Sequence, residues 1–531
     1  MSELDPIQLQ VVTGALRAAC EEMGAVLIRS ARSSNIKERR DASTALFNPA
    51  GEMVMQAEHI PVHLGSMPAA VRAILEEDHS QGMPWVLNDP FAGGTHLPDI
   101  TVITPILLDG VLMGYAASRA HHADVGGRTP GSMPADSHAL EEEGVVIGPT
   151  RLDEPTLRGL SAQMRQPAER EADLRAQLAA NRMGALRLSE LARRVGAERL
   201  SGAFGAVLDY AERRARACLA ALPDGERHAE DVLEDVAPEG DLVLRLRATV
   251  AGERLTLDFT GSAAQHGGNL NCPLAVTRSA CLFATRVLTD PDIPPSAGAY
   301  RPIEIVVPEG SILNARPMLV SGDAGTSGAL LSRPAVAAGN VETSSRVADL
   351  VLAAFGRAQG QGTMNNLTLG AAPDAPPRDG AAGRKDREGR GAGFSYYETL
   401  GGGQGACPDA DGPSGVHVAM SNTLNTPVEA LERDFPLRVV EYALRRGSGG
   451  AGAHRGGDGV VRELEALGEM TFSLIAERRR HSPRGAAGGG PGRPGRDSID
   501  GHLIPGKTTG TLKPGQRLRL ETPGGGGNGL H

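Results

Sequence analysis

Histidine and aspartate residues gather in two short segments that could bind a metal ion. His96 and Asp99 stand three residues apart in GGTHLPDI, and His121, His122 and Asp124 follow in SRAHHADVGG. Imidazoles and a carboxylate from two such loops form the N/O ligand set that Zn²⁺ or Mn²⁺ accepts, with positions left open for water or substrate. Single histidines more often form structural hydrogen bonds, but Gly and Pro turns rather than apolar runs flank both segments. We therefore expect a divalent metal here if the two loops meet.

Two carboxylates provide a second candidate for chemistry. Glu38 and Asp41 lie in SSNIKERRDAS, and His59 and His63 follow in AEHIPVHLGSM. Either carboxylate could act as a general base if it is desolvated near a cation. The alternative is the charged end of a helix, which composition alone favours. Further on, GTMNNLTLG, SYYETLGGG and MSNTLNTPVEALE are polar, Gly-flanked stretches that suit either a lined cavity or hydrogen-bonded turns.

Glycine is abundant, with 69 residues, but it does not form a phosphate-binding loop. GxxxxGK[ST] is matched at one place only, GHLIPGKT (501–508), where the run TTGTL that follows does not favour the helix that a phosphate loop requires, and no predicted strand is followed by GxGxxG at a helix start. Tight turns are the simpler interpretation of these glycines. We do not expect this chain to bind a nucleotide on its own.

These candidates must be positioned by an α+β fold. Asp5 and Pro6 are typical of a helix start, and apolar residues recur at helical spacing to about Ser30. Short apolar runs between turns then indicate strands. We expect, in order, the N-terminal helix and a turn-rich β region with the metal candidates (1–150), a helical region (151–223), an α+β core region (224–370), a low-complexity mobile loop (371–393) and a Gly-rich β/turn region (394–531).

Local patterns predict some elements in more detail. DLVLRLRATV and ERLTLDFTGS alternate on either side of Ala251 and Gly252, which indicates a hairpin. PLAVTRSACLFATRVL predicts a helix from Pro273. Two stretches, 315–334 and 371–393, have no periodicity and predict loops.

Composition excludes several classes of function. The 54 Lys and Arg residues against 64 Asp and Glu give a net charge of −10 with no dense basic run, so nucleic acid is not expected as a partner. No window reaches about 18 uninterrupted apolar residues and no signal peptide is visible, so we expect no membrane association. The five cysteines are far apart without a CxxC pair, which favours a reducing, cytoplasmic location.

A series of motifs in fixed order resembles the hydantoinase B family, the partner subunit of ATP-dependent hydantoinases and oxoprolinases. The family is related to the larger subunits of acetone and acetophenone carboxylases. The resemblance extends from about residue 4 to 530. Its blocks include NIKERRDAS, NDPFAGGTHLPDI, RAHHADVGGRTPGSMP, QGTMNNLTLG, YYETLGGGQGA, NTPVEALE and TPGGGGNG. Departures lie at 315–334 and 371–393, which are longer than the pattern, and at Asn528, where an aromatic residue is more usual.

The resemblance implies an enzyme of two subunits. A hydantoinase A-like, actin-like ATPase subunit would bind ATP and Mg²⁺ and phosphorylate a carbonyl oxygen, and this chain would take part in the hydrolysis that follows. The family's metal site carries over onto His96, Asp99 and His122, with His121 as the alternative ligand. Its carboxylate pair would be Glu38 and Asp41.

The implied reaction is the opening of a cyclic amide such as a hydantoin, 5-oxoproline or another lactam. Amide resonance of roughly 20 kcal/mol makes such a carbonyl a poor electrophile, and phosphorylation of its oxygen removes that protection. Water activated by Glu38 or Asp41, or by the metal, could then attack. A hetero-oligomer is expected. Two alternatives are a subunit of an ATP-dependent ketone carboxylase and a non-catalytic scaffold that completes the ATPase subunit's site.

Overall fold

The first elements of the chain form a long helix and a short one. The computed structural model describes residues 5–236, 238–321, 329–371 and 393–530. Helix α1 (Pro6–Ser30) begins as the sequence predicts, because the Asp5 side chain accepts a hydrogen bond from the Gln8 N–H at 2.8 Å. It buries Leu16 and Leu27, and the short helix α2 (Ser34–Lys37) follows.

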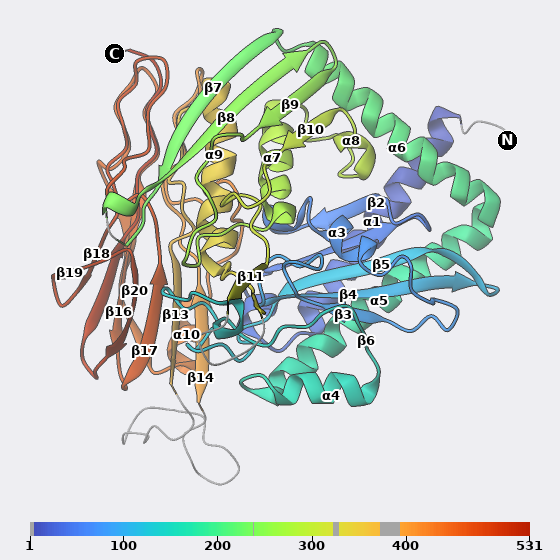
Figure 1. Ribbon diagram of the computed structural model, residues 1–531, viewed down its shortest axis with the longest axis horizontal. Coiled ribbons are helices and arrows are strands. Elements are labelled where there is room, and N and C mark those ends of the chain that lie inside the picture. The colour runs from blue at the N-terminus through green and yellow to red at the C-terminus, as the bar shows by residue number, and fades with distance from the viewer. Residues whose placement is uncertain (1–4, 237, 322–328, 372–392, 531) are drawn as a thin grey trace.

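A mixed layer of helices and an antiparallel sheet forms the N-terminal part (Figure 1). The strand order is β2-β1-β5-β4-β3-β6. Helices α1 and α5 pack on the sheet, and α3 also contacts β4 and β5. The bounds are β1 (Ala42–Phe47), β2 (Met53–Glu58), β3 (Trp85–Leu87), β4 (Asp99–Leu108), β5 (Val111–His121), β6 (Thr150–Arg151), α3 (Met67–Arg72) and the 3₁₀ turns η1 (Pro61–His63) and η2 (Leu140–Glu142).

Strand register in this sheet decides where the candidate residues lie. Strand β4 begins at Asp99 and β5 ends at His121, and these two residues face each other across the ladder. Strand β1 begins opposite Ala120, so Asp41 lies beside the same end of β5. One edge of the sheet therefore gathers residues from three strands.

The middle of the chain contains helices followed by a second sheet. Helices α4 (Glu154–Ala162), α5 (Pro167–Val195) and α6 (Ala197–Ala220) lie where the sequence predicts a helical region. The next sheet has the order β10-β9-β8-β7, and its β8–β9 pair is the predicted hairpin. Its elements are β7 (Gly225–Leu233), β8 (Leu242–Ala251), β9 (Arg254–Asp258), β10 (Ile303–Val306), α7 (Leu274–Leu288), α8 (Ala297–Tyr300), the π turn η4 (Gly339–Thr343), α9 (Ser344–Ala354) and the 3₁₀ turn η3 (Pro238–Gly240).

One predicted loop is wrong in part. Strands β11 (Met318–Ser321) and β12 (Ala329–Ser332) pair antiparallel inside the stretch 315–334. Four-residue strands are too short for an alternating pattern to stand out, and only pairing with each other reveals them. The predicted mobile loop 371–393 falls almost entirely outside the described residues.

Two further sheets form the C-terminal part, which Figure 1 shows at the left in orange and red. Their orders are β14-β13-β17-β20 and β15-β16-β21-β18-β19, and they enclose an apolar core. The bounds are β13 (Asn366–Ala371), β14 (Phe394–Glu398), β15 (Leu437–Arg445), β16 (Gly459–Ala466), β17 (Met470–Ile475), β18 (Arg496–Ile499), β19 (His502–Ile504), β20 (Lys507–Leu512), β21 (Arg517–Glu521) and α10 (Val428–Asp434). The α+β fold class is thereby confirmed.

The C-terminal glycines let backbone segments touch each other. A Cβ atom at Gly457 would lie 1.9 Å from the Pro413 carbonyl oxygen, and one at Gly525 would lie 2.1 Å from that of Gln404. Both glycines are needed because the facing backbone leaves no room for a side chain. Close backbone packing, in addition to tight turns, accounts for the glycine content of this part.

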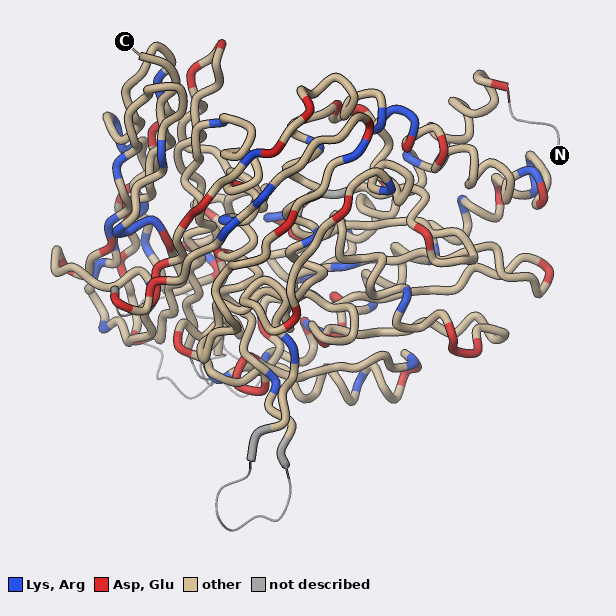
Figure 2. The backbone as a smooth tube through the Cα atoms, turned by 45° about the horizontal axis from the view of Figure 1, so that its top comes forward, with Lys and Arg blue, Asp and Glu red and all other residues tan. Residues whose placement is uncertain are grey.

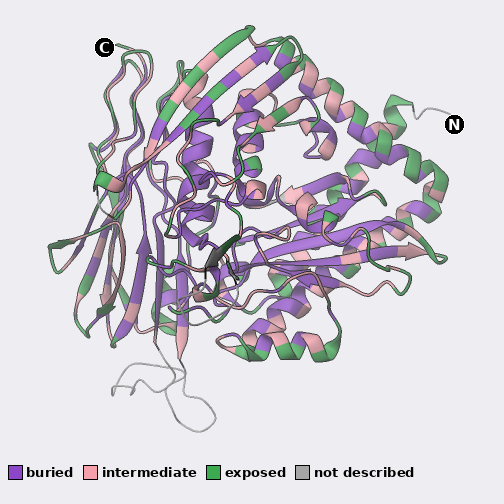
Figure 3. Cartoon of the chain, in the orientation of Figure 1, coloured by how far each residue is buried: buried purple, intermediate pink, exposed green. Residues whose placement is uncertain are grey.

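Buried residues follow the layers of the fold, whereas charged residues are spread along the chain. Buried residues line the sheets and the helix faces that contact them (Figure 3). Acidic and basic residues are interspersed along the chain (Figure 2). Among the described residues, none of the helices combines the length and apolar character that crossing a membrane requires.

Candidate metal centre

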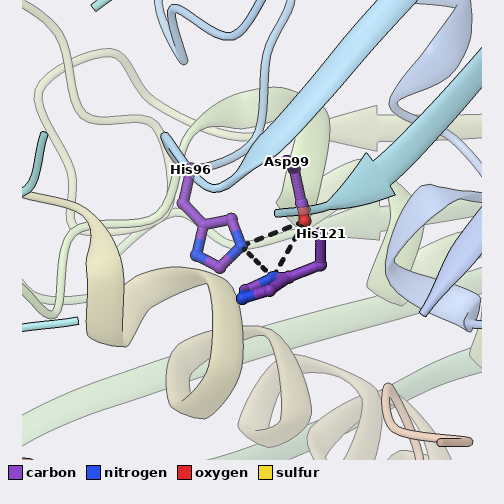
Figure 4. Close-up of side chains that lie close together, drawn as sticks. All are labelled: His96, Asp99 and His121. Carbon is purple, nitrogen blue, oxygen red and sulfur yellow. Dashed lines mark hydrogen bonds and ion pairs between the residues drawn. The ribbon is translucent and has the colours of Figure 1, made fainter. Parts of the chain in front are cut away.

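Three side chains converge at the edge of the first sheet (Figure 4). His96 lies in the loop before β4, Asp99 is the first residue of β4 and His121 is the last of β5. Distances of 3.2 Å join His96 Nε2 to Asp99 Oδ1, His121 Nδ1 to Asp99 Oδ1 and His96 Nε2 to His121 Nδ1. All three residues are buried. We call them the triad.

The triad fits a divalent metal. Atoms bound to one ion at about 2.0–2.2 Å in tetrahedral or octahedral geometry lie roughly 3.0–3.5 Å apart, as these do. The second oxygen of Asp99 is held in place, because Thr95 Oγ1 donates a hydrogen bond to it at 2.7 Å and His63 Nε2 lies 3.4 Å away. Such support is common for carboxylates that bind metals. Two imidazoles and a carboxylate are a donor set for Zn²⁺ or Mn²⁺.

The charge of Asp99 suits this role. Burial disfavours the charge on Asp99, but His96, His121 and His63 outweigh burial and hold the pKa of Asp99 well below its usual range. Burial also lowers the pKa of His63, despite its contact with Asp99. The cluster therefore contains an ionised carboxylate.

His122 lies on the other side of the strand end. Its Nε2 is 3.0 Å from Gln177 Oε1 on α5, and Gln177 in turn donates to the carbonyl oxygens of Ile100 and Ser118. Burial lowers the pKa of His122 to about 4. Successive residues of a strand point to opposite faces, so His121 and His122 cannot both join the triad. The structure brings His121 into the cluster, where the resemblance gave His122 first.

Asp124, from the same segment, holds a loop. Its carboxylate accepts hydrogen bonds from Gly126 N, Gly131 N and Ser132 Oγ. Arg165 also donates to it. Its role is therefore to fix the turn that follows β5.

The two predicted carboxylates separate. Asp41 is buried beside the triad, and its carbonyl oxygen accepts the His121 N–H at 3.0 Å. Burial raises the pKa of Asp41 to about 6, against the opposing charges of His121 and Arg39. Its Oδ1 has no hydrogen-bond partner. Glu38 is half-buried at the end of α2, and its charge acts on Arg433 of α10. The structure thus brings Asp41, but not Glu38, to the site.

Residues from distant parts of the chain complete the site. Tyr397 of β14 stacks on His121, with ring centroids 4.4 Å apart and planes at 25°. Burial and the charge of Asp41 raise the pKa of Tyr397 well above its usual range. Arg39 lies 5.4 Å from the centroid of the same ring. Sequence reasoning assigned no role to Tyr397 or Arg39, although the polar stretch SYYETLGGG was a signal for the first.

Several buried polar atoms at the site have no hydrogen-bond partner. They include Asp41 Oδ1, His121 Nε2 and two nitrogens of Arg39. Most buried polar groups in folded proteins are hydrogen-bonded, so such a group of exceptions calls for an explanation. A bound ligand would supply the partners.

The chain is similar to known proteins over its full length. A family model described as hydantoinase B/oxoprolinase matches residues 5–531. 5-Oxoprolinase 1 of Arabidopsis thaliana is 38% identical over 566 residues, which cover 99% of this chain and 42% of that protein. A Pseudomonas sp. protein described as the hydantoinase B component of a D-/L-hydantoinase is 29% identical and is covered to 90%, with all of this chain aligned. The chain spans about two fifths of the length of the 5-oxoprolinases that it matches.

Solved structures share the fold. The ATP-dependent caprolactamase from Pseudomonas jessenii superimposes with a TM-score of 0.85 at 26% identity, covering 100% of this chain and 92% of that one. Acetone carboxylase in a nucleotide-free structure has a TM-score of 0.83 at 18% identity, covering 99% and 76%. The second similarity concerns the fold alone.

Proposed function

The chain belongs to the hydantoinase B/oxoprolinase family, and we propose that it is the hydrolytic subunit of an ATP-dependent cyclic-amide hydrolase. The substrate would be a hydantoin, 5-oxoproline or another lactam. Relatives named as a 5-oxoprolinase, a D-/L-hydantoinase component and a caprolactamase support this class of substrate.

A second polypeptide would supply the ATP-dependent step. The matched 5-oxoprolinases are more than twice as long as this chain, which supports a hydantoinase A-like ATPase subunit as its partner in a hetero-oligomer. That partner would bind ATP and Mg²⁺ and phosphorylate the carbonyl oxygen of the substrate. Phosphorylation removes amide resonance of roughly 20 kcal/mol and leaves a carbon that water can attack.

His96, Asp99 and His121 would hold a divalent ion, Zn²⁺ or Mn²⁺. Such an ion would supply Lewis acidity next to the reacting carbon. The protein's own contribution is to orient the ligands: Thr95 and His63 fix the Asp99 carboxylate, and Tyr397 fixes the plane of the His121 ring by stacking.

The observation that carries the proposal is the unpartnered carboxylate oxygen of Asp41 beside the triad. A general base works best when its pKa lies near the working pH, and a pKa of about 6 leaves Asp41 ionised at neutral pH. Asp41 would take the proton of the attacking water at Oδ1. Tyr397, whose pKa is raised, stays protonated and keeps its O–H as a hydrogen-bond donor.

Reconstitution with the ATPase partner tests the proposal. The complex should open a lactam ring and hydrolyse ATP in step, and this chain alone should do neither. Lactam-stimulated ATP hydrolysis by the isolated chain, freed of contaminants, would contradict the division of labour. Turnover that requires bicarbonate and a ketone would instead assign the chain to a carboxylase.

A further inference from the structure

Arg39 is a fully buried cation that forms no ion pair with the part of the chain that the structure describes. Its Nη2 donates to Thr399 Oγ1 at 2.8 Å and to Thr423 Oγ1 at 2.9 Å, whereas Nε and Nη1 have no hydrogen-bond partner. Among the described residues, no carboxylate lies within ion-pair distance of this guanidinium. A buried charge of this kind is costly unless something neutralises it.

Other buried arginines are satisfied in ways that Arg39 is not. Arg346 and Arg478 form ion pairs with carboxylates, Glu477 at 3.1 Å and Asp231 at 2.9 Å respectively. Arg119 uses each of its three nitrogens, donating to Thr101, Ser66 and the Gly93 carbonyl. Open nitrogens also occur in Arg170, Arg346 and Arg478, but each of these guanidiniums faces a carboxylate, whereas Arg39 faces none among the described residues.

The backbone around Arg39 places its side chain in the interior. Arg40 adopts a left-handed conformation with φ of 57°, and the residues on either side of it are buried while Arg40 itself is exposed. The Leu424 N–H donates to the Arg39 carbonyl oxygen at 3.0 Å, which fixes the backbone. Two threonine hydroxyls then fix one end of the guanidinium.

Arg39 also lies within reach of the triad. Its guanidinium carbon is 5.4 Å from the centroid of the Tyr397 ring, and that centroid is 4.4 Å from the His121 ring. Its charge acts on Asp41, the proposed base. One small molecule could therefore contact the guanidinium and the reacting centre together.

We propose that Arg39 binds an oxyanion of the reacting molecule, which is either a carboxylate on the lactam or the phosphoryl group on its activated carbonyl. The identity of that molecule rests on the proposed function. Arginine suits this role because it stays charged and offers directed N–H donors to carboxylate and phosphate oxygens. The two sources share the same recognition chemistry, and binding measurements separate them.

The test measures binding by the full chain without ATP or turnover. Three probes are titrated: 5-oxoproline, which carries a carboxylate, 2-pyrrolidinone, the same ring without it, and inorganic phosphate. Wild type is compared with Arg39→Gln and with Arg40→Gln, a matched control at the exposed neighbour. Melting temperatures are recorded on the same preparations.

A carboxylate subsite predicts that wild type binds 5-oxoproline at least tenfold tighter than 2-pyrrolidinone, and that Arg39→Gln abolishes the difference. A phosphoryl subsite predicts that phosphate binds wild type and weakens at least tenfold in Arg39→Gln, while the two lactams bind alike. In both cases Arg40→Gln matches wild type, and Arg39→Gln melts no earlier because an unpaired charge has been removed.

The proposal is overturned if wild type binds neither oxyanion, or if Arg39→Gln binds both as wild type does. A lower melting temperature with unchanged affinities would make Arg39 a structural residue. Failure of the proposed function looks different: oxyanion binding would still depend on Arg39, while the complex with the ATPase partner would open no lactam.

Discussion

Two regions of the molecule contain buried charged side chains, and the regions differ in how these side chains are paired. Where β7, α9 and the segment after β17 meet, a set of opposite charges is paired: Asp231, Arg346, Asp349, Glu477, Arg478 and Lys507. We call this set the junction network. Around the triad, Arg39 and Asp41 each retain atoms with no partner.

The difference indicates what each region does. In the junction network every guanidinium faces a carboxylate, although Nε of Arg346 and of Arg478 also lacks an acceptor. Pairing of this kind joins distant segments, and removing one partner leaves a buried charge uncompensated. Polar groups left open beside the triad instead offer hydrogen-bonding positions that a ligand would complete.

The largest effect should follow loss of a metal ligand. His96→Ala should abolish bound divalent metal and ring opening by the complex, because one of the donors of the triad is gone. His122→Asn is the matched control, since His122 contacts Gln177 instead, and it should keep the metal. Metal analysis of the purified chains checks this. Equal metal content in His96→Ala and wild type would show that the triad is not the metal site.

Breaking the junction network should act on stability. Asp231 accepts hydrogen bonds from Arg478 and Gln359, so Asp231→Asn should lower the free energy of unfolding by about 3–5 kcal/mol. Glu230→Gln, at the exposed neighbour paired with Arg245, should change it by less than about 1 kcal/mol. Denaturant unfolding measures both. If Asp231→Asn and Glu230→Gln lower the free energy of unfolding by similar amounts, the buried pairs of the junction network stabilise the fold no more than a surface pair does.

A smaller effect concerns pH. Burial, with the charge of Glu477, raises the pKa of Glu342 to about 8 from an ordinary value of 4.5. Between these values the folded chain binds a proton that the unfolded chain lacks, so stability from this group falls as pH rises from about 5 to 8. Relative to wild type, Glu342→Gln should gain up to about 1.4 kcal/mol per pH unit. If the free energies of unfolding of wild type and Glu342→Gln change with pH by the same amount across this range, the pKa of Glu342 is not raised.

Local sequence patterns predicted what depends on near neighbours. Helix α1 has its N-cap at Asp5, and α7 begins after Pro273 as its spacing indicates. The turn residues around His96 and Asp99 likewise predicted a loop at the end of a strand, and β4 begins at Asp99. Choosing between His121 and His122 required knowing which face of β5 meets the triad, and that is a property of the assembled sheet.

Other parts of the site depend on long-range contacts. Tyr397 reaches the triad from another sheet. The turn at Arg40 separates Glu38 from Asp41, and nothing in their spacing shows which carboxylate is buried. From composition alone, the charged residues of the junction network would be expected at the surface. Only the folded chain shows that Asp231 and Arg478 pair in the interior.

The most direct test of the account compares Asp41→Asn with Glu38→Gln in complex with the ATPase partner. Asp41→Asn should lower the rate of ring opening by about 10² to 10⁴ and should melt no earlier than wild type, because burial already disfavours the Asp41 charge. Glu38→Gln should keep near-normal turnover, since Glu38 lies outside the triad. If Asp41→Asn keeps more than about a tenth of the wild-type rate, or loses activity only by unfolding, Asp41 is not the base and the central claim fails.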